Sequence, residues 1–155
     1  MIAVADTSPM NYLILIGEVE LLPRMFSRVV IPPAVRAELC HERTPPVVTS
    51  WVSRLPSWVE IVSADESSVG HALGRGEAEA IAVARQIAAD ITLIDERKAA
   101  LVARQNGLTV TGTLGVLDLA AEKGLVDLNV AVLRLLETNF RVSPPVVEEL
   151  LSRHR

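Results

Sequence analysis

Short apolar runs alternate with longer segments of helical periodicity along most of this chain. The short runs are typical of buried strands, and we expect strands at residues 2–5, 29–31, 58–62, 91–94 and 108–110. The longer segments repeat apolar residues at helical spacing, which predicts helices around residues 12–16, 34–42, 51–55, 77–89, 96–106 and 113–124. In the first of these, Pro9 fits the first helical turn, and Asp6 or Ser8 could cap it. Two further helical patterns follow, the second introduced by Ser143 and Pro144. Strands that alternate with helices predict a mostly parallel sheet with helices on both faces.

The composition fits one sizeable core. Half of the 155 residues are hydrophobic and only 3% are aromatic, so the core must consist mainly of Ala, Val, Leu and Ile. We expect a single domain over residues 1–155, with a C-terminal helical extension over residues 125–155. No apolar run approaches the roughly 20 residues of a spanning helix and no signal core is present, so we expect a soluble, cytoplasmic protein. Cys40 is the single cysteine, which excludes an intramolecular disulfide, and we expect its thiol to be buried.

The net charge limits how the chain can contact nucleic acid. A formal charge of −4 argues against an extended basic surface, because such surfaces bind by displacing counterions from phosphates with Lys and Arg. Any phosphate contact must therefore be local. A cluster of carboxylates that captures divalent cations would reconcile an acidic chain with a phosphate ligand, since the cations reverse the sign of the local field.

Two aspartates follow predicted strands directly. Asp6 ends the first apolar run, and Asp95 ends the run at residues 91–94. In open parallel sheets, sites form in the crevice beyond the carboxyl ends of the strands, so these two positions are the first candidates. Each also has a simpler interpretation, because Asp is a favourable helix cap and a helix is expected after both.

Helical projection separates the two glutamates that open one predicted helix. Glu77 falls on the same face as Ile81, whereas Glu79 falls on the opposite face, where we expect it to be solvated. A carboxylate on the inward face is unfavourable unless it is paired, hydrogen-bonded or bound to metal. The alternative for Glu77 is a first-turn glutamate at a solvated helix end. Glu38 lies at the border of its own helix's apolar stripe and can reach a cleft, although alone it would pass as a surface glutamate.

Carboxylates that share one crevice would repel one another unless cations were present, and hard oxygen ligands favour Mg²⁺ or Mn²⁺. The candidate metal ligands and catalytic residues are Asp6, Glu38, Glu77 and Asp95. Bound metals can lower the pKa of a coordinated water, hold a phosphodiester and stabilise charge on the attacking and leaving oxygens. No His, Ser or Cys nucleophile is then required, and the histidines, which show no ligand spacing, are His41, His71 and His154.

Hydroxyl and basic side chains supplement these carboxylates. The hydroxyls at strand-to-helix turns of the same edge belong to Thr7, Ser8 and Thr113. They could hold a metal-bound water or a phosphate oxygen, although capping is their commoner role. The basic residues that flank the acidic positions are Arg75, Arg97 and Lys98. They could supply local phosphate contacts, although exposed basic residues are usually only solvated.

Five short motifs together resemble those of PIN domains, and more narrowly those of VapC-like toxins and related nucleic-acid-binding PIN proteins. The motifs are residues 4–9 (VADTSP), 31–35 (IPPAV), 76–80 (GEAEA), 93–97 (LIDER) and 112–115 (GTLG). Their order and spacing carry the resemblance, and residues 139–144 (NFRVSP) resemble the tail of one PIN subfamily. The resemblance spans nearly the whole chain and implies an α/β fold, a three-layer α/β/α sandwich with a mostly parallel central sheet and C-terminal helices.

The resemblance also implies a function. Such proteins are metal-dependent endoribonucleases that hydrolyse RNA, typically cytoplasmic homodimers held inactive by a small antitoxin encoded beside them. It assigns catalysis to Asp6, Glu38, Glu77 and Asp95. Many such toxins carry aspartate at the position of Glu77 and a further acidic residue at the position of Arg97. We therefore predict one firm metal site and a weaker second site.

Two other functions fit parts of the pattern. A catalytically silent PIN-like module would hold RNA or a protein, and the apolar residues 130–136 could then serve a dimer or an antitoxin groove. Metal binding discriminates between this module and the nuclease. A phosphoryl-accepting receiver domain normally has adjacent acidic residues after its first strand and a late lysine in its sheet, and residues 5–7 and 110–112 supply neither.

Overall fold

A parallel β-sheet forms the centre of the computed structural model, which describes residues 1–65, 69 and 73–155 and so leaves His71 outside. The strands of the described residues are β1 (Ile2–Ala5), β2 (Arg28–Ile31), β3 (Val59–Ile61), β4 (Ile91–Leu93) and β5 (Val110–Thr111). They lie in the order β3-β2-β1-β4-β5, and each neighbouring pair is parallel. The prediction of a mostly parallel sheet is confirmed, with β1 at its centre.

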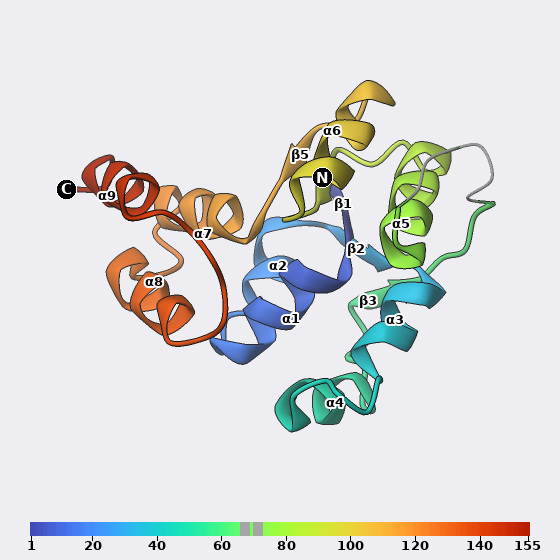
Figure 1. Cartoon of the computed structure of the whole chain (residues 1–155), viewed down its shortest axis with the longest axis horizontal. Helices are drawn as coiled ribbons and strands as arrows, with labels where there is room; N and C mark the ends of the chain where they lie inside the picture. The colour runs from blue at the N-terminus through green and yellow to red at the C-terminus, as the bar shows by residue number, and fades with distance from the viewer. Residues whose placement is uncertain (66–68, 70–72) are drawn as a thin grey trace.

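Helices follow the strands along the chain and cover the sheet (Figure 1). Within the described residues they are α1 (Thr7–Leu15), α2 (Leu21–Met25), α3 (Pro33–Leu39), α4 (Pro46–Val52), α5 (Arg75–Gln86), α6 (Arg97–Gln105), α7 (Thr113–Glu122), α8 (Leu128–Leu136) and α9 (Pro144–Ser152). Figure 1 shows α8 and α9 beside α7, at one end of the molecule. None of the helices in this described part is long and apolar enough to cross a membrane.

Alternate strand residues pack into two separate layers. Ala3 and Val29 contact a core that includes residues of α1, α2, α7 and α8, whereas Val4 and Val30 pack against α5 on the other face. Both faces of the sheet are thus covered, which explains why the central strands are apolar at nearly every position instead of alternating. The arrangement is the three-layer α/β/α sandwich that the family resemblance implied.

Two helices begin before their apolar residues do. Helix α1 starts at Thr7 with Asp6 at its N-cap position, which confirms the prediction of Pro9 in its first turn, and α4 starts at Pro46, ahead of the apolar residues from Trp51 onward that predicted it. Proline is favourable in a first helical turn, because the N–H that it lacks would have no partner within the helix. The five-residue helix α2 was missed altogether, since it is too short to show helical periodicity.

The predicted strand at residues 108–110 was shifted. Strand β5 begins at Val110, because Leu108 still belongs to the turn that ends α6, where its N–H donates to the Ala103 carbonyl at 3.1 Å. Gly107 makes that turn with a φ of 80°, a left-handed conformation that glycine adopts without strain. A turn residue was thus taken for the start of a strand.

The expectation of a buried Cys40 was wrong. Cys40 is exposed at the C-terminal end of α3, where its N–H donates to backbone carbonyls of the last helical turn. The buried position belongs to its neighbour Leu39, which is fully covered. Successive helical positions differ by about 100° around the axis, and here Leu39 takes the position that faces the core while Cys40 lies outside it.

Candidate active site

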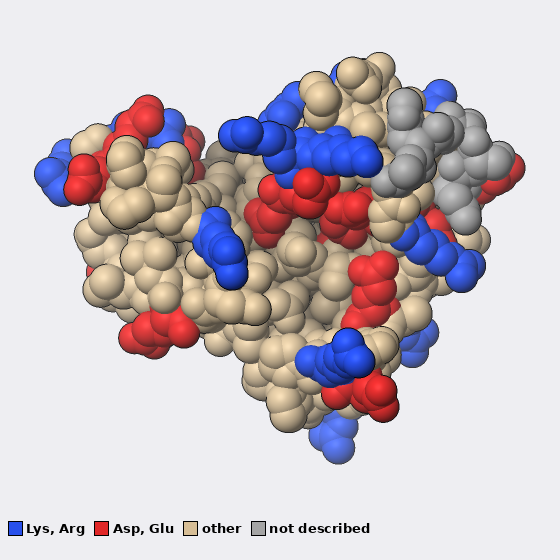
Figure 2. All heavy atoms as spheres, in the orientation of Figure 1, with Lys and Arg blue, Asp and Glu red and all other residues tan. Residues whose placement is uncertain are grey.

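Carboxylates from four separate parts of the chain lie at the carboxyl edge of the sheet. Asp6 follows β1 directly and Asp95 comes shortly after β4, and the N–H of Asp6 donates to the Leu93 carbonyl at 2.9 Å, which holds the two strand ends together. Glu38 of α3 and Glu77 of α5 lie near Asp6, close enough for their charges to act on it. Figure 2 shows acidic side chains in a hollow of this face, with basic side chains around its rim.

Asp6 is the most buried of the four carboxylates. Its residue is only 4% exposed, and its Oδ1 has no hydrogen-bond partner among the described residues. Burial raises the pKa of the Asp6 carboxyl to about 7, partly offset by the Thr7 N–H and increased further by Glu77, Glu38 and Asp95. An uncompensated acceptor in a buried position is costly, and it marks a place where a cation or a proton is accommodated.

Capping does not account for the two strand-end aspartates. Asp6 occupies the N-cap position of α1, but its side chain makes no capping hydrogen bond. Glu96 caps α6 in place of Asp95, because its carboxylate accepts the N–H groups of Lys98 at 3.0 Å and Ala99 at 2.8 Å. These two hydrogen bonds lower the pKa of Glu96. The simpler interpretation of Asp6 and Asp95 as caps of the helices that follow them is therefore wrong.

Glu38 is held in place from two sides. Its carboxylate accepts a short hydrogen bond from the Thr7 hydroxyl and another from the Gly76 N–H at 3.1 Å. A Cβ at Gly76 would lie only 2.6 Å from Oε1 of Glu38, so the carboxylate can occupy this place only beside glycine. The sequence predicted Thr7 as a supporting residue. Gly76 belongs to the motif at residues 76–80, but its role in positioning Glu38 was not predicted.

Glu77 lies in the first turn of α5 and is partly buried. Burial raises the pKa of its carboxyl, opposed by a hydrogen bond from the Gly74 N–H at 3.1 Å and reinforced by the charges of Glu96 and Glu38. Glu77 therefore combines both interpretations that the sequence left open. It satisfies a free N–H at the helix start, and its carboxylate lies within the acidic cluster.

Glu79 is buried, and the prediction that it is solvated was wrong. Only 5% of the residue is exposed, and its carboxylate accepts the Ala34 N–H at 3.1 Å and pairs with Arg75 at 3.0 Å. Helix α5 packs against α3 as well as against the sheet. The helical projection assumed that only one face of the helix is buried, but α3 covers the face that carries Glu79. Glu79 fixes the start of α3 to α5, the helices that carry Glu38 and Glu77. The spacing of Arg75 and Glu79, four residues apart on one helix, was the available signal.

Asp95 anchors the start of α7. It accepts hydrogen bonds from the Thr113 N–H and the Thr113 hydroxyl, both at 2.7 Å, and burial is the main cause that raises the pKa of its carboxyl. A Cβ at Gly112 would lie 2.6 Å from Oδ1 of Asp95. Thr113 was among the predicted supporting residues, and the structure brings it into direct contact with Asp95. Arg97, the first residue of α6, is exposed near this edge.

The chain matches a known family over nearly its whole length. A sequence family described as PIN domain covers residues 2–155. The chain belongs to the PIN-domain family. PIN domains are generally nucleases and typically use divalent metal ions, so this is a fold of the nuclease type. No curated protein and no solved structure matches the chain.

The acidic edge of this PIN domain has the ligand chemistry of a hard cation, since all four candidate side chains offer carboxylate oxygens. Among the described residues, however, no three His, Cys, Asp or Glu side chains lie close enough together to bind one metal ion. Glu38, Glu77 and Asp95 accept hydrogen bonds from the protein instead. The four carboxylates thus lie at the same edge of the sheet, but they are not arranged as the ligands of one metal ion.

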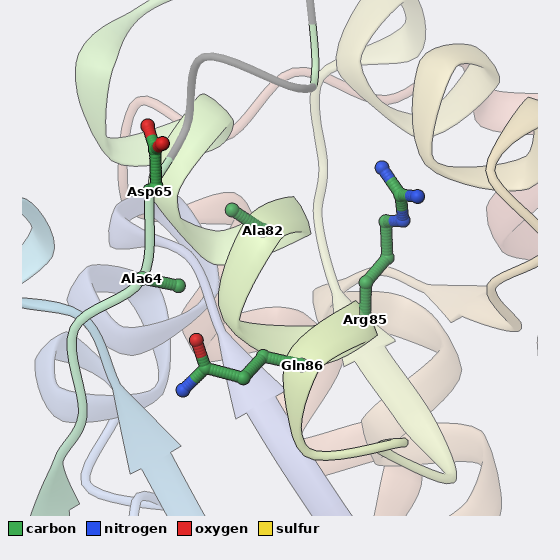
Figure 3. A pocket seen from close by; sticks show the side chains of 5 residues that line it. All are labelled: Ala64, Asp65, Ala82, Arg85 and Gln86. Atoms are coloured by element: carbon green, nitrogen blue, oxygen red, sulfur yellow. The ribbon is translucent and has the colours of Figure 1, made fainter.

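Two cavities of this PIN domain border the acidic edge. One, of about 330 Å³, includes Ser8, the third predicted hydroxyl residue, together with Asp95. The other, of about 420 Å³, lies beside Glu38 and Arg75. A further hollow of about 340 Å³ lies between α5 and the segment after β3 and contains none of the candidate residues. Figure 3 shows that Arg85 of this hollow points away from the segment after β3.

Proposed function

We propose that this PIN domain is a metal-dependent endoribonuclease that hydrolyses RNA, with Mg²⁺ or Mn²⁺ held by Asp6, Glu38, Glu77 and Asp95. The observation that carries the proposal is the carboxylate of Asp6, which is 4% exposed, lacks a partner for Oδ1 and has its pKa raised to about 7 beside three further carboxylates. A divalent cation would relieve both the repulsion and the unsatisfied oxygen.

The bound cation would supply an activated water and charge stabilisation for phosphodiester hydrolysis. The chain's own residues would position it. Thr7 and Gly76 hold Glu38, and Thr113 holds Asp95, so these hydrogen bonds limit how far the two carboxylates can move. Arg97 replaces a further acidic ligand, and we propose one firm metal site and a weaker second one.

Incubation of labelled RNA with the protein and Mn²⁺ tests this function. Cleavage should require the metal and should fall by more than roughly a hundredfold in Asp6→Asn, because losing a ligand costs more than the tenfold to hundredfold loss caused by a second-shell change. Glu137→Gln, which neutralises an exposed carboxylate at the end of α8, is the matched control and should cleave normally. Equal cleavage by wild type and Asp6→Asn would contradict the assignment.

A second candidate function is a PIN-like module that binds RNA or a protein without cutting. The hydrogen bonds that already occupy Glu38, Glu77 and Asp95 favour it, because side chains satisfied by the protein need no cation. A folded wild-type protein that binds RNA but shows no response to Mn²⁺ would support this module over the nuclease.

We further propose that the protein is the toxin of a toxin–antitoxin pair and forms a homodimer. Helix α8 buries Ala131 and Leu135 but leaves Val130, Leu133 and Leu136 exposed, with Leu133 62% exposed. Such an exposed apolar stripe fits a second copy of the chain, and a small antitoxin is the proposed regulator. Light scattering of wild type and Leu133→Glu tests the dimer, which the variant should dissociate.

A further inference from the structure

A cavity beside the acidic edge lies between α1 and the segment that connects α8 to α9. Its volume is about 330 Å³, and its lining residues are Ser8, Tyr12, Asp95, Glu96, Asn139, Phe140 and Arg141. Asp95 therefore faces the cavity while it also belongs to the proposed metal cluster. The lining combines aromatic, amide and basic side chains; Tyr12 and Phe140 also pack against the main core, whereas Arg141 is exposed.

The aromatic pair is the first feature that points to a ligand. Tyr12 and Phe140 pack edge to face, with ring centroids 5.0 Å apart and an interplanar angle of 84°. Both residues are only partly buried, although this chain contains a single tyrosine and two phenylalanines. Aromatic rings at the rim of a cavity offer π-faces on which nucleobases stack.

Two polar side chains beside the rings, Asn139 and Arg141, keep hydrogen-bond donors that bind no other described residue. The Tyr12 hydroxyl donates to Oδ1 of Asn139 at 2.9 Å, and no hydrogen bond within the described residues uses Nδ2 of Asn139. Arg141 is exposed and forms no ion pair there, although Asp95 and Glu96 line the same cavity. An amide donor and a guanidinium are thus free to bind a ligand that carries acceptor oxygens.

The segment that carries these groups is fixed in place. The Thr138 hydroxyl donates to the Leu135 carbonyl at 2.5 Å and accepts the Phe140 N–H at 3.1 Å. The Tyr12–Asn139 hydrogen bond ties the same segment to α1, which begins directly after Asp6. The segment's own hydrogen bonds thus define its turn, and the Tyr12–Asn139 bond connects it to the helix that follows Asp6.

We propose that this cavity binds one nucleotide of a single-stranded RNA, next to the phosphate held at the acidic edge. The base stacks on the face of Phe140, the Asn139 amide donates to an acceptor of the nucleotide, and Arg141 contacts a phosphate oxygen. The inference rests on the proposed function, because it assumes that RNA reaches Asp95. It adds the location of substrate recognition, which the carboxylates do not determine.

Fluorescence anisotropy of a labelled single-stranded RNA measures binding to the cavity. Ca²⁺, a hard cation that also takes oxygen ligands, replaces Mg²⁺ or Mn²⁺ in this binding assay. Phe140→Leu keeps apolar volume but removes the ring, and it should raise Kd by roughly fivefold or more, the value of one stacked base. Phe140→Tyr should restore binding. Arg141→Gln should weaken binding and reduce its salt dependence by about one charge. Arg104→Gln, an exposed arginine near the end of α6 and so at the opposite edge of the sheet, should leave binding unchanged.

The outcomes separate this inference from the nuclease proposal. RNA binding that depends on Phe140 and Arg141 supports the cavity even when Mn²⁺ produces no cleavage, a result that would overturn only the nuclease. With cleavage present, both variants should raise KM and leave kcat within about twofold. Cleavage with unchanged KM and Kd in both variants overturns the cavity alone. Failure of the wild type to bind any RNA overturns both proposals.

Discussion

Replacing Gly76 by alanine should damage metal binding far more than folding. The new Cβ would lie 2.6 Å from Oε1 and 2.9 Å from Oε2 of Glu38, so the carboxylate must leave its present place. It would lose the hydrogen bonds from the Gly76 N–H and the Thr7 hydroxyl. Each contributes about 1 kcal/mol at an exposed residue such as Glu38, for a loss of about 2 kcal/mol.

Helix propensity offsets part of that loss. Alanine is about 1 kcal/mol more favourable than glycine within a helix, and position 76 lies in the first turn of α5. The net cost of Gly76→Ala should therefore be about 1 kcal/mol, or a fall of roughly 2–4 °C in Tm for a chain of this size. Affinity for Mn²⁺ should fall by about tenfold to a hundredfold, the usual cost of disturbing the support of a ligand.

A double-mutant cycle with Glu38→Ala isolates this effect. Glu38→Ala removes the three atoms nearest to the Cβ at position 76, so Gly76→Ala should then no longer change Mn²⁺ affinity and should raise Tm slightly. Calorimetric titration with Mn²⁺ and thermal unfolding measure both quantities. Wild-type affinity in Gly76→Ala, or full additivity of the two substitutions, would refute the positioning of Glu38 by Gly76.

Three further predictions follow from the same cluster. The pKa of Asp6 rises from its usual 3.8 to about 7 on folding, so the metal-free protein should lose stability as pH rises from about 4 to 7. Asp6→Asn should weaken this pH dependence, leaving the part that the raised pKa values of Glu77 and Asp95 cause, and should stabilise the metal-free protein above pH 7 by up to about 4 kcal/mol, measured by urea unfolding at several pH values; an unchanged profile would count against the buried carboxyl. Thr113→Val removes one of two hydrogen bonds to Asp95 and should cost about 1–2 kcal/mol in urea unfolding, whereas a neutral effect would contradict the contact. Glu79→Ala should cost about 1–3 kcal/mol, since the Ala34 N–H loses its acceptor, while Glu77→Ala should leave Tm of the metal-free protein nearly unchanged; equal effects would show that the two roles are wrongly divided.

The sheet was accessible from sequence because its signal is local and repeated. Strand β1 is flanked on both sides by strands and covered by helices on both faces, so the whole run at residues 2–5 is apolar. The start of strand β5 was predicted too early. Gly107, with a φ of 80°, turns the chain after α6, and Leu108 is an apolar residue of this turn and not of the strand. Such conformations depend on backbone geometry that periodicity does not record.

Only part of the candidate site could be predicted from the sequence. Topology alone brings Asp6 and Asp95 together, because the carboxyl ends of neighbouring parallel strands share an edge. The spacing of Arg75 and Glu79 indicated their ion pair, but the sequence could not predict the burial of Glu79, since it results from the packing of α5 against α3, two helices far apart in the sequence. The same packing decides that Gly76 faces Glu38, so the need for glycine became visible only in three dimensions.

The thermal midpoint of the purified protein across a Mn²⁺ titration tests the central claim most directly, because it needs no knowledge of the RNA. A ligand at a hundredfold excess over its Kd adds about 2.7 kcal/mol to the stability of the folded state. Wild type and Glu137→Gln should both shift to higher Tm, whereas Asp6→Asn and Asp95→Asn should not. A wild-type protein that unfolds cooperatively at the same Tm with and without Mn²⁺ would contradict the assignment of a metal site to these carboxylates.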